Sequence, residues 1–521
     1  MVTRSVSPLA MTLLMAAAFL SIFDLFVVNV ALPSLQDSLE ASLGQAGLVV
    51  AAYELSFGMT LISSSRLGDR YGRRRLFGWG VGSFSVASAL CGLAPEIHSL
   101  ILARILQGAT AALMFPQVYA ILRVSVAAER QRSAFACLGA CLGLAALSGQ
   151  VLGGWLLHAD LLELGWRMIF LINVPIGLLI LVLLRHIPES REPAGAHLTP
   201  GTALALALGV LGVLLGLLEG PARHWPVWSL ISLLGGASLL ILTARREYLR
   251  QHRGLPVLLD MQLLLRPDFR YASLLVILLY STAGAFFISF ALLSQQGLGL
   301  TPMQAGLLFA PANVMFMLAS LTAPLLVRRL GNTVILAGGV LHIISFIGLA
   351  AYALLHHDSA GLGLLRALVM LLGIAQGLTM TPLLGLLLSR VSIEQAGPAS
   401  GLLSTLQQVG AALGVCAITL LYAPALSELP ELPGHLEGFL HVQGYAIVAA
   451  ILMSLLLWRQ IRPDVHGQPA TYADTRPAVQ PCPAAQPVNA GAATAPAGPG
   501  GSTGAAARTT AATCAPGGQG R

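Results

Sequence analysis

The chain consists mostly of apolar stretches about 20 residues long, separated by short polar connections. A helix of about 20 apolar residues spans the hydrocarbon core of a bilayer, and only 10% of the 521 residues are charged. This composition excludes an ordinary soluble domain. We expect an all-α polytopic membrane protein with fourteen spans, at 9–32, 43–65, 76–94, 98–122, 134–157, 167–185, 200–218, 226–244, 271–295, 304–327, 333–355, 363–388, 399–422 and 438–458.

The basic residues predict how these spans lie in the membrane. All 29 are arginine; the arrangement places 25 on the side of the N-terminus and three on the other, with Arg104 inside a span. Because basic residues accumulate on the cytoplasmic side, we expect a multi-pass protein of the cytoplasmic (inner) membrane with both termini in the cytoplasm. A Walker A loop needs a lysine, so any work that this chain performs must draw on a gradient or on a separate subunit.

A weak internal repeat indicates two related halves. Superposing Gly72 on Gly331 also pairs Arg70 with Arg329, and the Gln107-Gly108 pair has an echo at 376–377. Parallel repeats of this kind are typical of one transporter architecture, while chance similarity among leucine- and glycine-rich helices is the alternative.

The repeat predicts four parts of the chain. They are an N-terminal six-helix half at 1–191, a linker with two extra transmembrane helices at 192–270, a C-terminal six-helix half at 271–462, and a tail at 463–521. The tail is rich in Ala, Pro, Gly and Thr and has almost no large apolar residues, so we expect it to be disordered and cytoplasmic.

The polar segment SRLGDRYGRRRL at 65–76 joins the second and third predicted spans. We expect a tight loop whose arginines lie among lipid headgroups. Its acid could pair with arginines or face the start of the helix that follows Gly397-Pro398, which would form a latch between the halves. An ordinary basic loop is the alternative. The residues of this candidate gate are Asp69, Arg70, Gly72, Arg73 and Arg74.

Three charged residues lie deep inside the predicted spans, away from the span ends: Asp24, Glu54 and Arg104. A charge at the bilayer centre costs roughly 2.5–3.5 kcal/mol on insertion scales, so each is a candidate for function. Their depths in their helices are comparable, and together they could carry protons. For Asp24 and Arg104, a structural ion pair is the alternative.

Polar and aromatic side chains on several spans could line a substrate cavity. Gln107 and Gly108 share a helix face with Arg104. The aromatic residues could form a wall of the cavity, or they could pack against other helices. The amide side chains could line the cavity, or they could bridge helices by hydrogen bonds. The candidates are Asn29, Gln107, Gly108, Gln150, Tyr280, Phe287, Asn313, Gln376 and Gln407. No nucleophile–base pair or metal-spaced His/Cys set is evident, so we expect no enzyme activity, metal or cofactor.

Several motifs resemble the fourteen-helix drug:proton antiporter family (EmrB/QacA-like) of the major facilitator superfamily. The segment 65–76 is similar to the signature G-x-L-x-D-R-x-G-R-R/K, with Ser65 at its first glycine. Four further segments resemble motifs of that family: FDLFVVNVALP (23–33), LARILQGATAA (102–112), WRMIFLINVPIG (166–177) and LLSQQGLGLTPMQAGLLFAP (292–311). The resemblance implies two six-helix halves plus two inserted central helices, and it associates Arg104 with proton coupling.

The resemblance also implies proton-coupled efflux of amphipathic small molecules or drugs by alternating access. The alternatives are a dedicated exporter of a natural product or metabolite, a proton-coupled importer, and a non-transporting membrane sensor. One departure bears on the direction of transport: the fifth-helix motif G-P-x-x-G-G has Gln150 at its proline. The expected partners are a small-molecule substrate, protons and the lipid bilayer, with a periplasmic adaptor protein if the host has an outer membrane and with no nucleic acid.

Overall fold

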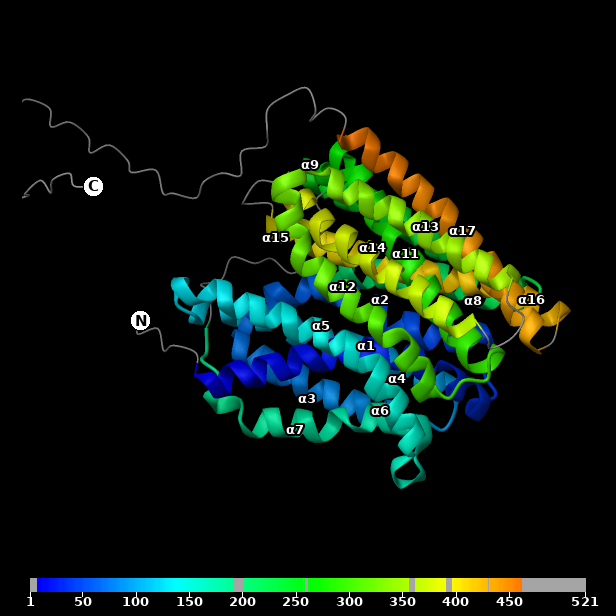
Figure 1. Cartoon of the computed structure of the whole chain (residues 1–521). Helices are drawn as coiled ribbons and strands as arrows, with labels where there is room; N and C mark the ends of the chain where they lie inside the picture. The colour runs from blue at the N-terminus through cyan, green and yellow to red at the C-terminus, as the bar shows by residue number, and fades with distance from the viewer. Residues whose placement is uncertain are drawn as a thin grey trace, which may run out of the picture. The chain divides into compact units, whose positions relative to one another are not determined.

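A computed structural model describes residues 7–190, 200–255, 257, 261–355, 361–389, 396–429 and 431–461; the tail predicted at 463–521 lies outside them. Within these ranges the regular structure is helical (Figure 1). A helix covers each of the fourteen predicted spans, and most helices extend several residues beyond the predicted ends.

The N-terminal half contains α1 (Pro8–Leu39), α2 (Leu43–Tyr71), α3 (Arg73–Gly92), α4 (Ile97–Ser125), α5 (Ala128–Ala159), and the short α6 (Met168–Leu171) and α7 (Asn173–Val182), which share one span. The inserted pair is α8 (Pro200–Ala222) and α9 (Val227–His252), followed by the short α10 (Met261–Leu265). The C-terminal half contains α11 (Pro267–Leu292), α12 (Pro302–Leu330), α13 (Thr333–Leu355), α14 (Leu362–Ser389), α15 (Ala396–Ala417), α16 (Ala423–Glu428) and α17 (Glu431–Ile461).

Most of these helices are apolar enough to cross a bilayer. Eleven helical segments of the described chain meet that requirement by length and hydropathy, and a shorter apolar segment lies within α8. The two other predicted spans, α2 and α3, flank the arginine segment and contain more polar and small residues. The fold is therefore that of a multi-pass membrane protein.

The arginine segment forms a sharper turn than the expected loop. Helix α2 continues to Tyr71 and α3 begins at Arg73, so Gly72 alone separates them, with φ of 102°. Only glycine adopts this backbone conformation without strain. Arginine has a high helix propensity, so the neighbouring arginines extend the two helices instead of forming a loop.

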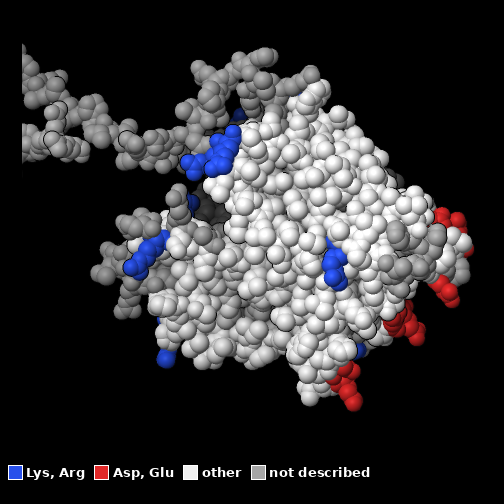
Figure 2. Space-filling view, in the orientation of Figure 1, with Lys and Arg blue, Asp and Glu red and all other residues white. Residues whose placement is uncertain are grey.

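The connection predicted at 423–437 is also mostly helical. A π-helical turn (Ile418–Tyr422) continues α15 into α16, and α17 already begins at Glu431. The acidic residues of this segment therefore lie on helices. Figure 2 shows acidic side chains gathered at the end of the molecule where α16 lies, whereas most of the visible basic side chains lie toward the other end.

The two halves repeat the same packing. Helix α2 packs along α4, and α12 packs along α14. A Cβ atom on Gly108 would lie 2.3 Å from the carbonyl oxygen of Tyr53, and one on Gly377 would lie 2.6 Å from that of Phe316. Gly331, like Gly72, has a positive φ, of 65°, at the turn between its two helices. These equivalent contacts support the repeat that the sequence indicates.

The inserted pair packs as a hairpin on the first half. Helices α8 and α9 pack along each other, and α8 also contacts α2. A Cβ atom on Gly44 of α2 would lie 2.5 Å from the carbonyl oxygen of Leu218 on α8. On α9, the buried side chain of Glu247 accepts a hydrogen bond of 2.8 Å from the hydroxyl of Thr202 on α8. The hairpin is thus held by backbone proximity and by a buried polar contact.

The contacts between α5 and α12 gather away from the arginine end, which we define as the end carrying the turn at Gly72. At the opposite end of α5, a Cβ atom on Gly154 would lie 2.5 Å from the carbonyl oxygen of Pro302 on α12. Nearer the arginine end, a Cβ on Gly143 would come only within 4.0 Å of Met317, and one on Gly139 would meet nothing within 4 Å. Helices α5 and α12 therefore diverge toward the arginine end.

The close contact between α2 and α4 gives a test of the fold. We expect Gly108→Ala to lower the melting temperature of the purified protein, because the new methyl group would clash with the backbone of Tyr53 and overpacking costs about 1–3 kcal/mol. Gly139→Ala is the matched control, since it adds a methyl group to a helix where nothing lies within 4 Å. Equal melting temperatures for the two variants would contradict this packing.

Candidate functional site

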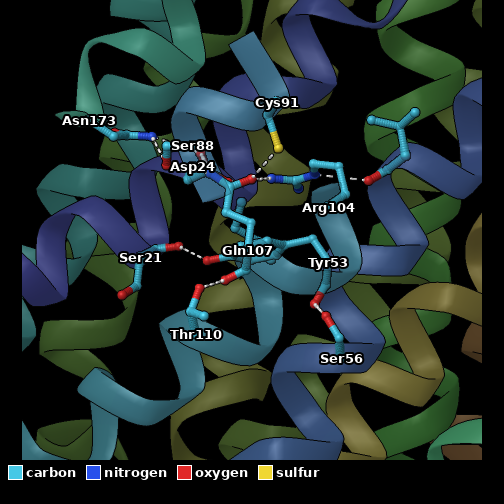
Figure 3. Close-up of polar contacts among 12 residues, drawn as sticks. Ser21, Asp24, Tyr53, Ser56, Ser88, Cys91, Arg104, Gln107, Thr110 and Asn173 are labelled. Atoms are coloured by element: carbon cyan, nitrogen blue, oxygen red, sulfur yellow. Dashed lines mark hydrogen bonds and ion pairs between the residues drawn. The ribbon is translucent and has the colours of Figure 1, made fainter. Parts of the chain in front are cut away.

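A buried polar network joins four helices of the N-terminal half (Figure 3). Asp24 on α1 forms an ion pair with Arg104 on α4, and both side chains are at most 1% exposed. Asp24 Oδ1 also accepts hydrogen bonds from Gln107 Nε2 at 2.8 Å and from Asn173 Nδ2, on α7, at 2.9 Å. The hydroxyl of Ser88 on α3 accepts a further bond of 2.8 Å from Gln107 Nε2.

The guanidinium group of Arg104 is held on several sides. Its Nε donates to the carbonyl oxygen of Val49 on α2 at 3.0 Å, and Nη1 donates to Gln107 Oε1 at 2.7 Å. Its Cζ lies 4.2 Å from the ring centre of Tyr53, within the range of a cation–π contact. The hydroxyl of Tyr53 in turn donates to the carbonyl oxygen of Ser21 at 2.9 Å. Arg104 thereby connects α1, α2 and α4.

Local sequence explains how these groups converge. Arg104 and Gln107 are three residues apart and therefore share one face of α4. Asn173 is the first residue of α7, immediately after the break at Ile172. Sequence reasoning named Gln107, which belongs to the network, but it missed Asn173 and Ser88. An isolated amide inside the apolar run 166–177 was the signal that could have identified Asn173.

Glu54 lies apart from the network. It follows Tyr53 on α2 and is 7% exposed, but its Oε2 atom is buried and has no hydrogen-bond partner among the described residues. The hydrogen bonds and the ion pair of Arg104 go to Val49, Asp24 and Gln107, and none of them reaches Glu54. The structure therefore brings Asp24 and Arg104 into contact and leaves Glu54 unbonded nearby.

The described part of the candidate gate contacts its own half. Arg74 forms an ion pair with Glu189 at 3.7 Å, and its backbone N–H donates a hydrogen bond of 3.0 Å to that carboxylate. The backbone N–H of Arg73 donates to the carbonyl oxygen of Ser190 at 3.0 Å. Arg70 is exposed, and the side chain of Asp69 lies outside the described residues. The latch predicted for Asp69 stays a prediction.

Two of the cavity candidates on α4 serve packing and the polar network. Gln107 is fully buried within the network, and Gly108 lies at the contact between α2 and α4. Phe287 belongs to an aromatic cluster with Phe309 at 5.4 Å between ring centres, and it also meets Phe26 of the other half at 5.6 Å, edge to face. These rings pack against one another, and a substrate-facing role for Phe287 stays a prediction.

The other six cavity candidates lie on six different helices. Asn29 is buried, and its Nδ2 donates weakly to the carbonyl oxygen of Leu25 at 3.4 Å. Gln150 is buried on α5, where its carbonyl oxygen would lie 2.6 Å from a Cβ on Gly306 of α12. The remaining candidates are Tyr280 on α11, Asn313 on α12, Gln376 on α14 and Gln407 on α15. Gln150 thus takes part in the contact between the halves, and a substrate role for any of these residues stays a prediction.

The sequence and the fold were compared with those of known proteins. Residues 14–415 match the family described as Major Facilitator Superfamily. The chain is 31% identical to the probable actinorhodin transporter of Streptomyces coelicolor over 79% of this chain and 72% of that protein. It is 32% identical to the cephamycin export protein CmcT of Amycolatopsis lactamdurans, over 89% of this chain and 96% of that protein. It is also 32% identical to the drug efflux pump JefA of Mycobacterium tuberculosis, over 79% and 80%.

Solved structures share the fold at lower sequence identity. A bacterial homologue of the human lysosomal transporter Spinster superposes with a TM-score of 0.63 at 16% identity, covering 89% of this chain and 98% of that one. A peptide transporter POT gives a TM-score of 0.64 at 14% identity, covering 89% and 97%. Together with the family match, these similarities show that the chain belongs to the Major Facilitator Superfamily.

Proposed function

We propose that the chain is a proton-coupled exporter of amphipathic small molecules, of the fourteen-helix drug:proton antiporter type. Its superfamily consists of transporters, which bind small-molecule substrates within the membrane and are not enzymes. The observation that carries the proposal is the pair of buried carboxyl groups with opposite surroundings: Asp24 is saturated with donors, whereas Glu54 has a buried oxygen without one. Curated relatives named as exporters and efflux pumps support the direction.

Asp24 serves as the fixed counter-charge of Arg104. Three side chains donate to its carboxylate, and each such bond stabilises the ionised form. Protonating Asp24 would leave the guanidinium of Arg104 buried without its anion, which costs about 3–5 kcal/mol when one partner of a buried pair is removed. The network therefore keeps its charges through the transport cycle and fixes the positions of α1, α2, α4 and α7.

Glu54 is the group that exchanges protons. A buried ionised carboxylate without donors is strongly unfavourable, so Glu54 is expected to carry a proton in this conformation. It becomes able to release that proton when water or a cationic substrate reaches it. The fixed positive charge of Arg104 nearby favours that release by attracting the carboxylate that remains.

The contacts between the halves fit alternating access. Tight contacts lie at the end opposite the arginine segment, where Gly154 packs on Pro302, and α5 and α12 diverge toward the arginine end. If the arginine end is cytoplasmic, as the positive-inside rule predicts, this conformation opens inward. Rocking of the halves about the α2–α15 and α5–α12 contacts would then open the outer side.

A dedicated natural-product exporter is the second candidate. The names of the similar actinorhodin and cephamycin transporters favour it. A broad drug exporter and a dedicated one would share the same coupling chemistry.

The different roles proposed for Asp24 and Glu54 can be tested in inside-out vesicles. We expect Glu54→Gln to reduce proton-driven substrate uptake at least tenfold while substrate counterflow without a proton gradient continues, because the substitution removes the proton site and nearly keeps the shape of the side chain. Glu219→Gln is the matched control: Glu219 is another buried glutamate, on α8, and it is paired with Arg223 instead of lying near the network. Wild-type proton-driven uptake in Glu54→Gln would contradict the proposal.

Asp24→Asn is expected to behave differently from Glu54→Gln. Because it removes the anion of a fully buried pair, it should lower both proton-driven uptake and counterflow and also the melting temperature. Measurement of all three quantities on the same purified preparation distinguishes the two roles. Normal stability and normal counterflow, with only the coupling lost, would assign the proton to Asp24.

The direction of transport has its own test. Inside-out vesicles with an acidic interior should accumulate an aromatic polyketide or a lipophilic cationic dye when they contain the chain, and collapse of the gradient should release it. Accumulation that instead requires an acidic exterior would identify a proton-coupled importer. A chain that moves none of a broad panel and whose Glu54→Gln variant changes nothing would fit a membrane sensor.

A further inference from the structure

A pocket lies at the end of α9, far along the chain from Asp24 and Glu54. Its volume is about 520 Å³, and it is lined by seven residues: Leu242, Arg245, Arg246, Leu249, Arg250, Arg253 and Leu255. Four of the seven are arginines, and none of these described lining residues is acidic. We propose that this pocket binds the headgroup of an anionic phospholipid, with the acyl chains lying along α9.

The backbone turn at the C-terminal end of α9 shapes the pocket. At the end of α9 the N–H of Leu255 donates to the carbonyl oxygen of Arg250 at 3.0 Å, and the N–H of Gly254 donates to that of Gln251 at 3.0 Å. Gly254 has a φ of 66°. This pair of bonds with a left-handed glycine is a Schellman motif, in which the chain turns back on the last helical turn. Leu255 is thereby folded back beside the arginines.

The turn is anchored to the next helix. Gln251 Oε1 accepts hydrogen bonds from the backbone N–H groups of Met261, at 2.9 Å, and Gln262, at 3.2 Å. These two groups lie at the first turn of α10, where backbone donors have no partner within the helix. Hydrogen bonds therefore hold the arginine-lined surface in place on both sides of the turn.

The arginines share one face of α9 with exposed leucines. Residues 242, 245, 246, 249, 250 and 253 follow the three- and four-residue spacing of a single helix face. Leu242 is 61% exposed and Leu249 is 45% exposed. The acid of this helix, Glu247, is buried instead against α8 through Thr202. The face thus presents positive charge directly beside apolar surface.

The position of the pocket in the membrane indicates which kind of ligand it binds. Only 17% of the apolar window of α9 is buried inside the protein, so most of this helix is exposed to lipid. The arginines occupy its last turns, where a spanning helix reaches the headgroups, and basic clusters at that depth attract anionic lipids. Arginine donates in a planar fork that matches phosphate oxygens. A phospholipid satisfies both requirements, because its phosphate meets the arginines while its chains cover the leucines.

Thermal unfolding of the full chain in detergent tests the proposal. We expect added phosphatidylglycerol to raise the melting temperature of the monodisperse protein by several degrees, because a ligand that binds the folded state stabilises it. Phosphatidylcholine and inorganic phosphate, added at equal concentration, should not. The variant Arg245→Gln/Arg246→Gln should lose most of the rise, and Arg245→Lys/Arg246→Lys, which keeps the charges but not the planar fork, should keep part of it.

Arg328→Gln/Arg329→Gln is the matched control. It also removes two adjacent arginines from the end of a spanning helix, α12, but these are not in the pocket. It should keep the full rise, and native mass spectrometry should show phosphatidylglycerol bound to it as to the wild type. Equal loss in both glutamine variants would overturn the proposal in favour of general surface charge, and an equal rise with inorganic phosphate would overturn the lipid as ligand.

Discussion

The buried ion pair between Asp24 and Arg104 is the interaction on which the N-terminal half depends. A charge in hydrocarbon must find a partner, and here the partner is supplied by a different helix, so neither helix can move alone without exposing a charge. The hydrogen bonds from Gln107, Asn173 and Arg104 extend this constraint to α3 and α7 and to the backbone of α2. We therefore expect α1, α2, α3, α4 and α7 to move together as one unit.

Between the halves, the contacts are of another kind. No described ion pair joins α5 to α12 or α2 to α15; instead, glycines bring backbones together, as at Gly154 and Gly306, and a hydrogen bond of 3.0 Å joins Thr405 to the carbonyl oxygen of Gly58. Small residues allow close packing in lipid without a large favourable energy. Surfaces of this kind can separate and re-form, whereas the charged network within the half cannot.

Much of the fold could be predicted from the sequence, because hydrocarbon imposes a length and a composition on every span. The fourteen spans, the two halves and the inserted pair all follow from apolar runs and an internal repeat. The errors lie at polar boundaries: the segments 65–76 and 423–437 were expected as loops and are largely helical. Polarity marks where a helix leaves the hydrocarbon, but the helix itself ends only where the backbone changes, as at Gly72.

For the site, the sequence by itself determined which groups had to be accounted for: Asp24, Glu54 and Arg104 stand out because charges are rare and costly in a membrane. The sequence could not determine which of the three form an ion pair and which one stays without a partner. Only the tertiary structure decided that Asp24 receives three donors from α4 and α7. Glu54 follows Tyr53, whose ring stacks on Arg104, and yet one of its buried oxygens has no partner among the described residues. Spacing along one helix fixes which face a residue occupies, whereas a hydrogen bond between helices depends on their rotation and depth, which packing of the whole bundle sets.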